Sequence, residues 1–220
     1  MDLASTVRQV IIAVVPILIA ITFHEASHGY IANKLGDPTA KVMGRLTLNP
    51  LAHIDLFGTI IVPIFLYIFS GFVIGWAKPV PINPHNFKNP KRDMAISAAG
   101  GPAINLILAA ISILLIRLVI FPSAEIFPAS FTSTVFRPLY EMLRISAIIN
   151  VILAIFNMIP IPPFDGGRVA VGLLPYRQAI SLSKLEPYGF FIVIILFFVL
   201  KIGNYIFSPI LILIYKLTLP

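Results

Sequence analysis

Three uncharged apolar stretches constrain the fold of this chain more than any other feature of its sequence. Residues 56–77, 94–116 and 145–164 contain no aspartate, glutamate, lysine or arginine, and each provides about the 20 residues that an α-helix needs to cross a bilayer. Over the whole chain 58% of residues are hydrophobic and only 11% are charged, which leaves more apolar surface than a soluble core can bury. The stretches lack the strict alternation of a membrane β-barrel. We therefore expect an all-α polytopic membrane protein.

Further apolar runs raise the expected number of transmembrane helices to about six. The last two runs hold only about 14 residues each, so either two helices or one broken helix fits them. The connections 75–93 and 121–137 are too short to fold as domains of their own. We expect one membrane-embedded domain over residues 1–220, with a core at about 7–175, C-terminal helices at about 187–217, and short re-entrant or β-like loops near the active site. The expected spans are 7–33, 56–77, 94–120, 138–159, 187–200 and 202–216.

The charge balance limits the classes of partner. The chain has 16 lysines and arginines against 9 aspartates and glutamates, a formal net charge of +7. In a membrane protein such an excess places basic residues in loops beside anionic lipid head groups, so we expect the lipid bilayer and no nucleic acid as a partner. The chain has no cysteine, which excludes disulfide bonds and thiolate metal ligands.

A polar cluster interrupts the first apolar run. Residues 23–30 read FHEASHGY, so His24, Glu25 and His28 form the pattern H-E-x-x-H. Residues four apart lie on one face of a helix, where two imidazoles can bind one zinc ion with the glutamate beside an attacking water. Ionisable residues inside a membrane usually mark a functional site, although a histidine pair can also serve only as a hydrogen-bonding contact between helices. The pattern predicts a zinc site on the first helix.

A catalytic zinc ion keeps three protein ligands, so the chain must supply a third. Asp165 stands out because it closes the stretch NMIPIPPFDGG, in which prolines break the helix and two glycines permit unusual backbone angles. Irregular backbone at membrane depth is tolerated where it lines a cavity, which is the setting of a metal ligand. An N-cap role for Asp165 on the next helix is the alternative. The other candidate donors are His53, His85, Asp37, Asp55, Asp93 and the remaining glutamates.

Several motifs, in this order, resemble those of the site-2 protease family of intramembrane zinc metalloproteases. H-E-x-x-H in a membrane span is followed far downstream by N-x-x-P and P-P-F-D-G. The stretches GRLTLNPLAHIDLFGT, GWAKPVPIN and AAGGPAIN are similar to parts of its minimal members, which lack PDZ and CBS domains. The resemblance implies that His24, His28 and Asp165 hold one catalytic zinc ion. It further implies that Glu25 is the general base and that Asn157 contacts substrate or the oxyanion.

Smaller features each have two interpretations. The stretch AAGGPAIN forms a small-residue face that ends at Asn105, which predicts a close helix contact with a hydrogen bond across it. A direct role of Asn105 in binding substrate or the oxyanion is the alternative. His53 and Asp55 precede the second apolar run and indicate a structured loop beside the site, or else additional metal ligands. Many relatives have leucine where this chain has Phe164, and phenylalanine keeps the apolar bulk.

The resemblance implies a zinc endopeptidase that cleaves transmembrane or membrane-proximal segments of membrane proteins, in regulated proteolysis or in removal of signal-peptide remnants. The expected location is a multi-pass position in the cell membrane of a prokaryote. The expected partner is a substrate with a transmembrane helix, and the sequence leaves open a regulatory membrane protein or a homo-oligomer. The alternative functions are a membrane metal transporter and an inactive scaffold that binds client proteins. Neither alternative requires Glu25 between the two histidines.

Overall fold

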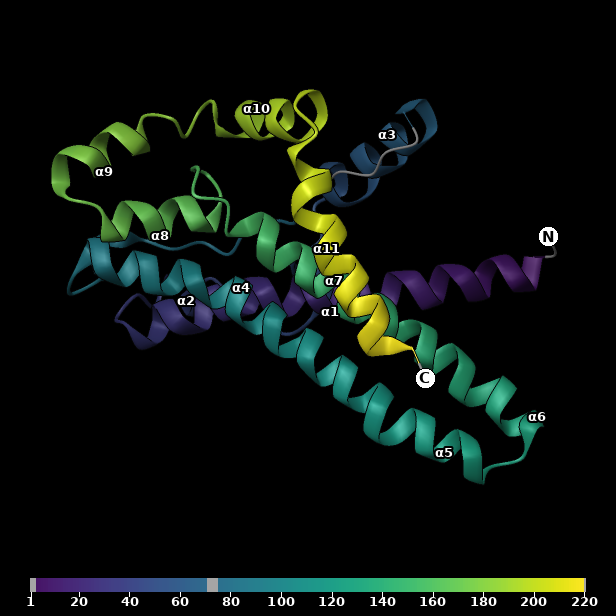
Figure 1. Ribbon diagram of the computed structural model, residues 1–220. Helices are drawn as coiled ribbons and strands as arrows, with labels where there is room; N and C mark the ends of the chain where they lie inside the picture. The colour runs from purple at the N-terminus through teal and green to yellow at the C-terminus, as the bar shows by residue number, and fades with distance from the viewer. Residues whose placement is uncertain (1–2, 71–74, 220) are drawn as a thin grey trace.

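The computed structural model describes residues 3–70 and 75–219, and these residues form a bundle of helices without any β-strand (Figure 1). The expected all-α fold is therefore confirmed for this part of the chain. In place of the expected β-like loops, residues 45–49 and 75–83 form irregular backbone outside any helix. The helices are α1 (Leu3–Lys34), α2 (Thr39–Val42), η1 (Pro50–Ala52), η2 (Leu56–Ile61), α3 (Val62–Ser70), η3 (Pro84–Asn86), α4 (Pro90–Leu115), η4 (Ile116–Ile120), α5 (Phe121–Ile126), α6 (Ala129–Phe131), η5 (Thr132–Phe136), α7 (Arg137–Asn157), α8 (Asp165–Leu173), α9 (Tyr176–Ser183), α10 (Gly189–Ile194), η6 (Ile195–Val199) and α11 (Ile202–Thr218).

Three helical stretches are long and apolar enough to cross a membrane, namely Val7–Lys34, Pro90–Ile126 and Ala129–Asn157. They match the positions of the first, third and fourth expected spans. A fourth crossing results only if Gly189–Phe197 and Ile202–Thr218, which are bent by 71° against each other, form one broken span. Among the described residues the expected count of about six is therefore not reached.

The expected span at 56–77 folds differently because the chain returns to where the stretch began. Its helical part consists of η2 and α3, which end at Ser70. The backbone N–H of Trp76 donates to the carbonyl oxygen of Gly58 at 3.0 Å, and a Cβ on Gly58 would lie 2.3 Å from the indole nitrogen. A stretch whose two ends touch is not one straight crossing. Residues 71–74 of this expected span lie outside the described residues.

Helix α4 lies at the centre of the bundle, where it packs against α1, α7 and α8 (Figure 1). Small residues allow its close approach to α1, because a Cβ on Gly100 would lie only 2.3 Å from Cδ1 of Ile31. Such small-residue faces replace the hydrophobic effect as the basis of helix packing inside a membrane. Because α1 and α8 both contact α4, the histidines of α1 and the aspartate that begins α8 are brought to the same helix.

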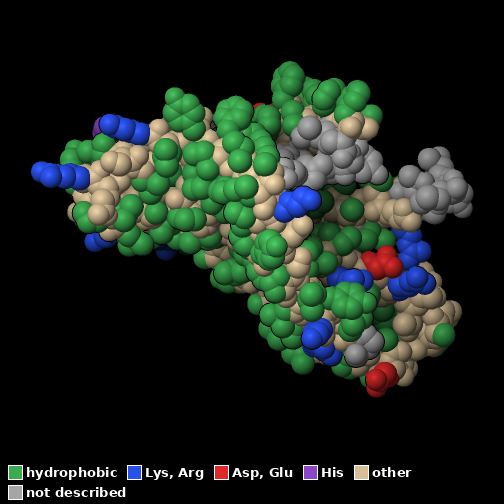
Figure 2. Space-filling view, turned by 45° about the horizontal axis from the view of Figure 1, so that its top comes forward, with side chains coloured by type: hydrophobic (Ala, Val, Ile, Leu, Met, Phe, Trp, Pro, Cys, Tyr) green, Lys and Arg blue, Asp and Glu red, His purple; other side chains and the backbone are tan. Residues whose placement is uncertain are grey.

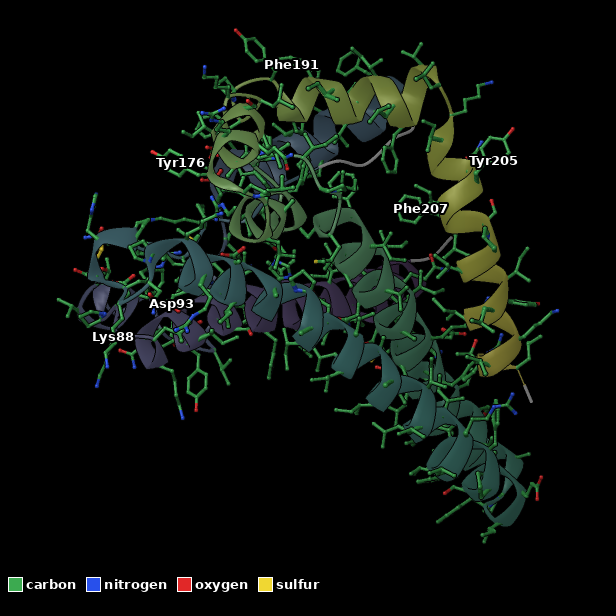
Figure 3. All side chains as sticks on the ribbon, turned by 60° about the vertical axis from the view of Figure 1, so that its left-hand side comes forward. Lys88, Asp93, Tyr176, Phe191, Tyr205 and Phe207 are labelled. Atoms are coloured by element: carbon green, nitrogen blue, oxygen red, sulfur yellow. The ribbon has the colours of Figure 1, made fainter. Side chains whose placement is uncertain are left out.

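Large apolar side chains cover the outside of the bundle. Figure 2 shows many apolar side chains on the viewed face, with lysine and arginine side chains at its left end, near its middle and at its lower right. In Figure 3, Phe191 and Tyr205 lie on the outer side of their helices, and they are 64% and 82% exposed. Phe207 instead packs against Phe197, with 5.6 Å between the ring centroids. So much exposed apolar surface is rare on a soluble monomer and supports a membrane protein.

Candidate metal centre

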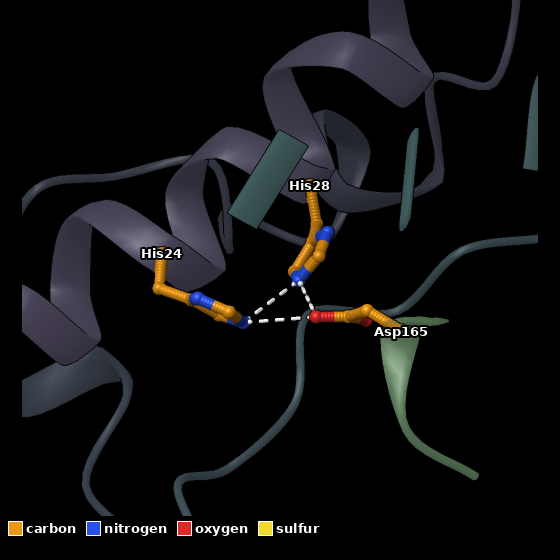
Figure 4. A group of neighbouring side chains, drawn as sticks. All are labelled: His24, His28 and Asp165. Carbon is orange, nitrogen blue, oxygen red and sulfur yellow. Dashed lines mark hydrogen bonds and ion pairs between the residues drawn. The ribbon is translucent and has the colours of Figure 1, made fainter. Parts of the chain in front are cut away.

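The side chains of His24, His28 and Asp165 meet at one point (Figure 4). The two histidine Nε2 atoms are 3.1 Å apart. The Oδ2 atom of Asp165 lies 3.2 Å from Nε2 of His24 and 3.3 Å from Nε2 of His28. All three residues are buried. The structure thus brings together the three residues of the expected ligand set, two from α1 and one from α8.

Asp165 is positioned by the tight loop that precedes it. Helix α8 begins at Asp165, directly after the loop 158–164. A Cβ on Gly166 would lie 2.2 Å from the carbonyl oxygen of Met158, so the loop can fold against the helix only because this residue has no side chain. The N-cap position belongs to Phe164. Asp165 therefore does not have the alternative N-cap role, and its carboxylate faces the two imidazoles.

The outer nitrogens of both imidazoles are fixed by contacts with α4. Nδ1 of His24 lies 2.5 Å from Oδ1 of Asn105, and Nδ1 of His28 lies 2.8 Å from the carbonyl oxygen of Ser97. Since both partners are oxygen acceptors, each Nδ1 carries the proton and donates it. In the neutral imidazole, which is the form that binds a metal, each Nε2 is then left with a lone pair that points towards Asp165.

With both imidazoles neutral, three acceptor atoms converge without a hydrogen atom between them. Oδ2 of Asp165 is buried and accepts no well-formed hydrogen bond from the described residues. An uncompensated buried carboxylate is costly, and the neighbouring lone pairs repel it unless a cation lies among the three atoms. Ligands at about 2.0–2.1 Å from a tetrahedral zinc ion are separated from each other by about 3.3–3.4 Å, close to the separations seen here. The two nitrogens and one oxygen fit a zinc ion that keeps a fourth position open for chemistry.

Glu25 is held by an extended segment that lies over α1. Its side chain is half-buried, and Oε2 accepts a hydrogen bond of 2.9 Å from the backbone N–H of Val80. Val80 is buried against Gly29, where a Cβ would lie 2.8 Å from its Cγ1 atom. The segment 77–83 therefore orients one carboxylate oxygen of Glu25 and leaves the other oxygen available for a proton.

This segment is bound in turn to the loop that contains His53. The backbone N–H of Lys78 donates to the carbonyl oxygen of His53 at 2.9 Å, and the Arg45 guanidinium donates to the carbonyl oxygen of Lys78 at 3.0 Å. His53 is buried, and its Nε2 donates to the carbonyl oxygen of Thr47 at 2.9 Å. In the structure His53 belongs to a structured loop and does not join the ligand cluster.

The other candidate donors also have partners outside the cluster. Asp55 accepts a hydrogen bond of 2.6 Å from the backbone N–H of Gly58 and so caps η2. Asp93 accepts one of 2.9 Å from the backbone N–H of Asn89 at the start of α4. His85 is exposed in η3. None of these three lies in the one metal-ligating group found among the described residues.

Asp37 has a structural role at the end of α1. Burial alone would raise its pKa. Hydrogen bonds from the side chains of Asn86 and Thr39 and from the backbone N–H of Asn83 outweigh this effect and hold the pKa of Asp37 below its ordinary value. The carboxylate therefore fastens η3 to the end of the helix that carries the histidines.

The two asparagines expected to contact substrate lie in different surroundings. Asn157 is half-buried at the end of α7, and its Nδ2 donates to a carbonyl oxygen one turn earlier at 3.0 Å. Asn105 is fully buried, and its Nδ2 donates to the carbonyl oxygen of Ala20 at 3.3 Å and to Oδ1 of Asn150 at 2.6 Å. These contacts favour a role for Asn105 beside His24 over contact with substrate. Sequence analysis missed Asn150, although a polar residue within an apolar helix was a signal for it.

Comparison with known proteins gives one family and two similar relatives. Residues 12–200 match the family model described as Peptidase family M50. The protein named "Putative zinc metalloprotease YwhC" of Bacillus subtilis is 38% identical over 198 residues, which cover 90% of this chain and 84% of that protein. "Putative zinc metalloprotease Rip2" of Mycolicibacterium smegmatis is 26% identical over 205 residues, which cover 93% of this chain and 73% of that protein. No solved structure matches the chain.

Proposed function

This chain belongs to peptidase family M50, the site-2 protease family, and we propose that it is a zinc-dependent endopeptidase that cleaves membrane proteins within or beside their transmembrane segments. The observation that carries the proposal is the convergence of His24, His28 and Asp165 on one point, with Glu25 on the same helix. Two imidazoles, a carboxylate and a neighbouring glutamate are the parts that metal-assisted peptide hydrolysis requires. Three helices that could span a membrane support a site within the bilayer.

His24, His28 and Asp165 would hold the zinc ion, which when bound supplies Lewis acidity at the substrate carbonyl and allows water to act as a nucleophile at neutral pH. Glu25 takes the proton from the attacking water and later passes it to the leaving amine. The backbone N–H of Val80 holds one oxygen of Glu25, so the other oxygen is the one that receives the proton. Asn157 has a second amide hydrogen beyond the one used within α7, and we assign it to the oxygen of the substrate carbonyl.

The substrate must present an extended stretch, because a helix hides its peptide carbonyls in its own hydrogen bonds. Two segments offer backbone for such pairing, residues 41–48 and the proline-rich loop before Asp165. Residues 41–42 belong to α2, but residues 45–48 are irregular backbone, and residues 46–48 border a groove of about 340 Å³ on α1. We propose that this groove guides the substrate towards the metal centre along the neighbouring face of α1. None of its lining residues is a metal ligand, and they are Phe23, Ala26, Ser27, Tyr30, Leu46, Thr47, Leu48 and Ile104.

The proposal is tested with purified protein in liposomes that also contain a single-span reporter protein. Wild type is expected to hold about one zinc ion and to cut the reporter, whereas Glu25→Gln holds zinc and cuts at least about 100-fold more slowly. Asp165→Ala is expected to lose zinc, and Leu48→Glu, at the rim of the groove, to keep zinc and cut slowly. Folded wild type that holds zinc and never cuts a reporter would refute the protease. Zinc flux across the liposome that persists in Glu25→Gln would indicate a transporter instead.

A further inference from the structure

A chain of buried polar side chains leads away from the metal centre between α4 and α7. Nδ1 of His24 lies 2.5 Å from Oδ1 of Asn105, and Nδ2 of Asn105 lies 2.6 Å from Oδ1 of Asn150. Nδ2 of Asn150 lies 2.9 Å from the carbonyl oxygen of Ser146. Both asparagines are 0% exposed. Side-chain amides at such depth are costly unless every hydrogen-bonding atom has a partner, so their arrangement constrains the helices around them.

Two main-chain carbonyl groups fix the direction of this chain. A carbonyl oxygen only accepts, so the atom of Asn105 that faces Ala20 at 3.3 Å is its amide nitrogen, and the same holds for Asn150 facing Ser146. Oδ1 of Asn105 must then face His24, whose Nδ1 must donate. The network is compatible with only one neutral tautomer of His24. In that tautomer the Nε2 lone pair faces the other two ligands.

We infer that Asn105, and through it Asn150, are positioning residues that set the tautomer and ring orientation of His24 and thereby raise the affinity of the site for its metal. The inference rests on the proposed metal centre and assigns a function to two residues outside the ligand set. Mutation of a residue that hydrogen-bonds a metal-ligating histidine typically lowers metal affinity by about 10–100-fold. Asn150 is separated from His24 by a whole side chain, yet its loss is expected to weaken metal binding.

The experiment compares three variants of the full chain in detergent. Zinc affinity is measured by competition with a chelator, and the absorption bands of the Co²⁺-loaded protein report on the ligand geometry. Asn105→Leu removes the acceptor for His24 and is expected to lower zinc affinity by about 10–100-fold and to shift the Co²⁺ bands. Asn105→Asp keeps an acceptor oxygen for His24, and its zinc affinity is expected to lie within a few-fold of that of wild type. In Asn150→Leu the amide nitrogen of Asn105 keeps only its bond to Ala20. The zinc affinity of this variant is expected to lie between those of wild type and Asn105→Leu.

The order of the variants separates positioning from packing. If Asn105 were needed only to hold helices together, Asn105→Asp would be at least as harmful as Asn105→Leu, because a carboxylate cannot donate to Ala20 or to Asn150. Thr218→Ala is the control: it removes a hydroxyl that is equally buried but lies on α11, where it donates to the carbonyl oxygen of Ile214 at 2.9 Å, and it is expected to bind zinc as wild type does. Should Asn105→Leu fail to fold, Asn105→Asp and Asn150→Leu still give the comparison.

The results separate the positioning role from the protease proposal. Equal zinc affinity in wild type and Asn105→Leu, or equal losses in Asn105→Asp and Asn105→Leu, would overturn the positioning role and leave the protease proposal standing. The expected order of affinities in a protein that never cuts a reporter would support the positioning role and count against the protease. An equal loss of zinc affinity in Thr218→Ala would show general loosening of the bundle and would also overturn the inference.

Discussion

Replacing Gly101 by alanine tests whether α4 is shaped around the imidazoles. A Cβ on Gly101 would lie 2.5 Å from Nε2 of His28 and 2.6 Å from Nε2 of His24. Ordinary contact between such atoms is at about 3.5 Å, so the rings or α4 must move by about 1 Å. Overpacking of this kind lowers the free energy of unfolding by about 1–3 kcal/mol. The better helix propensity of alanine offsets about 0.5–1 kcal/mol of this loss. Because functional sites tolerate displacements of about 0.5 Å, we expect zinc affinity to fall at least tenfold, or about 1.4 kcal/mol.

Gly100→Ala is the control for this prediction. The new Cβ would lie 2.3 Å from Cδ1 of Ile31 and 3.1 Å from Oγ of Ser27, and neither atom belongs to a ligand. Ile31 can rotate its terminal methyl group away, so zinc affinity is expected to stay within about twofold of wild type while the melting temperature falls. Chelator competition and thermal unfolding are measured on both variants. A folded Gly101→Ala protein with wild-type zinc affinity, or an equal loss of zinc in Gly100→Ala, would refute the reasoning.

Three further predictions follow from contacts outside the ligand set. Val80→Pro removes the backbone N–H that holds Glu25. Because a hydrogen bond to a charged group contributes about 1.5–3 kcal/mol, we expect cleavage to slow by about 10–100-fold at unchanged zinc content. An unchanged cleavage rate would contradict this prediction. Arg117→Ala removes a guanidinium that donates to two carbonyl oxygens at the end of α11, and we expect a loss of about 0.3–1 kcal/mol and a drop in melting temperature of about 1–4 °C. A melting temperature equal to that of wild type would show that this contact does not hold α11. The pKa of Asp37 lies below its ordinary 3.8, so its contribution is present above pH 3.8 and is lost as pH falls through the lower folded pKa. Metal-free wild type is therefore expected to lose stability more steeply below pH 4 than metal-free Asp37→Asn, and equal slopes would contradict this.

The local part of the site could be predicted from the sequence because it depends on helix periodicity. His24 and His28 are one turn apart on any helix, and their side chains meet as the spacing requires. Asp165 was identified by the prolines and glycines around it, and the glycines do allow the loop to fold tightly against α8. In both places the constraint lies within a few residues of the functional side chain.

Long-range contacts could not be predicted in the same way. The stretch 56–77 has the composition of a crossing, but the contact of Trp76 with Gly58 turns it back, and composition carries no information on that hydrogen bond. Asn105 was expected to lie in a helix contact, yet its three partners lie on α1 and α7, so its direction depends on how three helices meet. The same dependence concealed Asn150, which acts through another side chain.

The division of the ligand set between α1 and α8 has a consequence for biogenesis. During synthesis the two histidines emerge with the first helix, whereas Asp165 follows only after α4 and α7 have been made. A chain that is still being inserted therefore has two imidazoles and no third donor, and a catalytic zinc site needs three. The proposed peptidase activity should consequently arise late and abruptly, once most of the bundle is assembled. A nascent or truncated chain without Asp165 would lack the third ligand of the proposed zinc site.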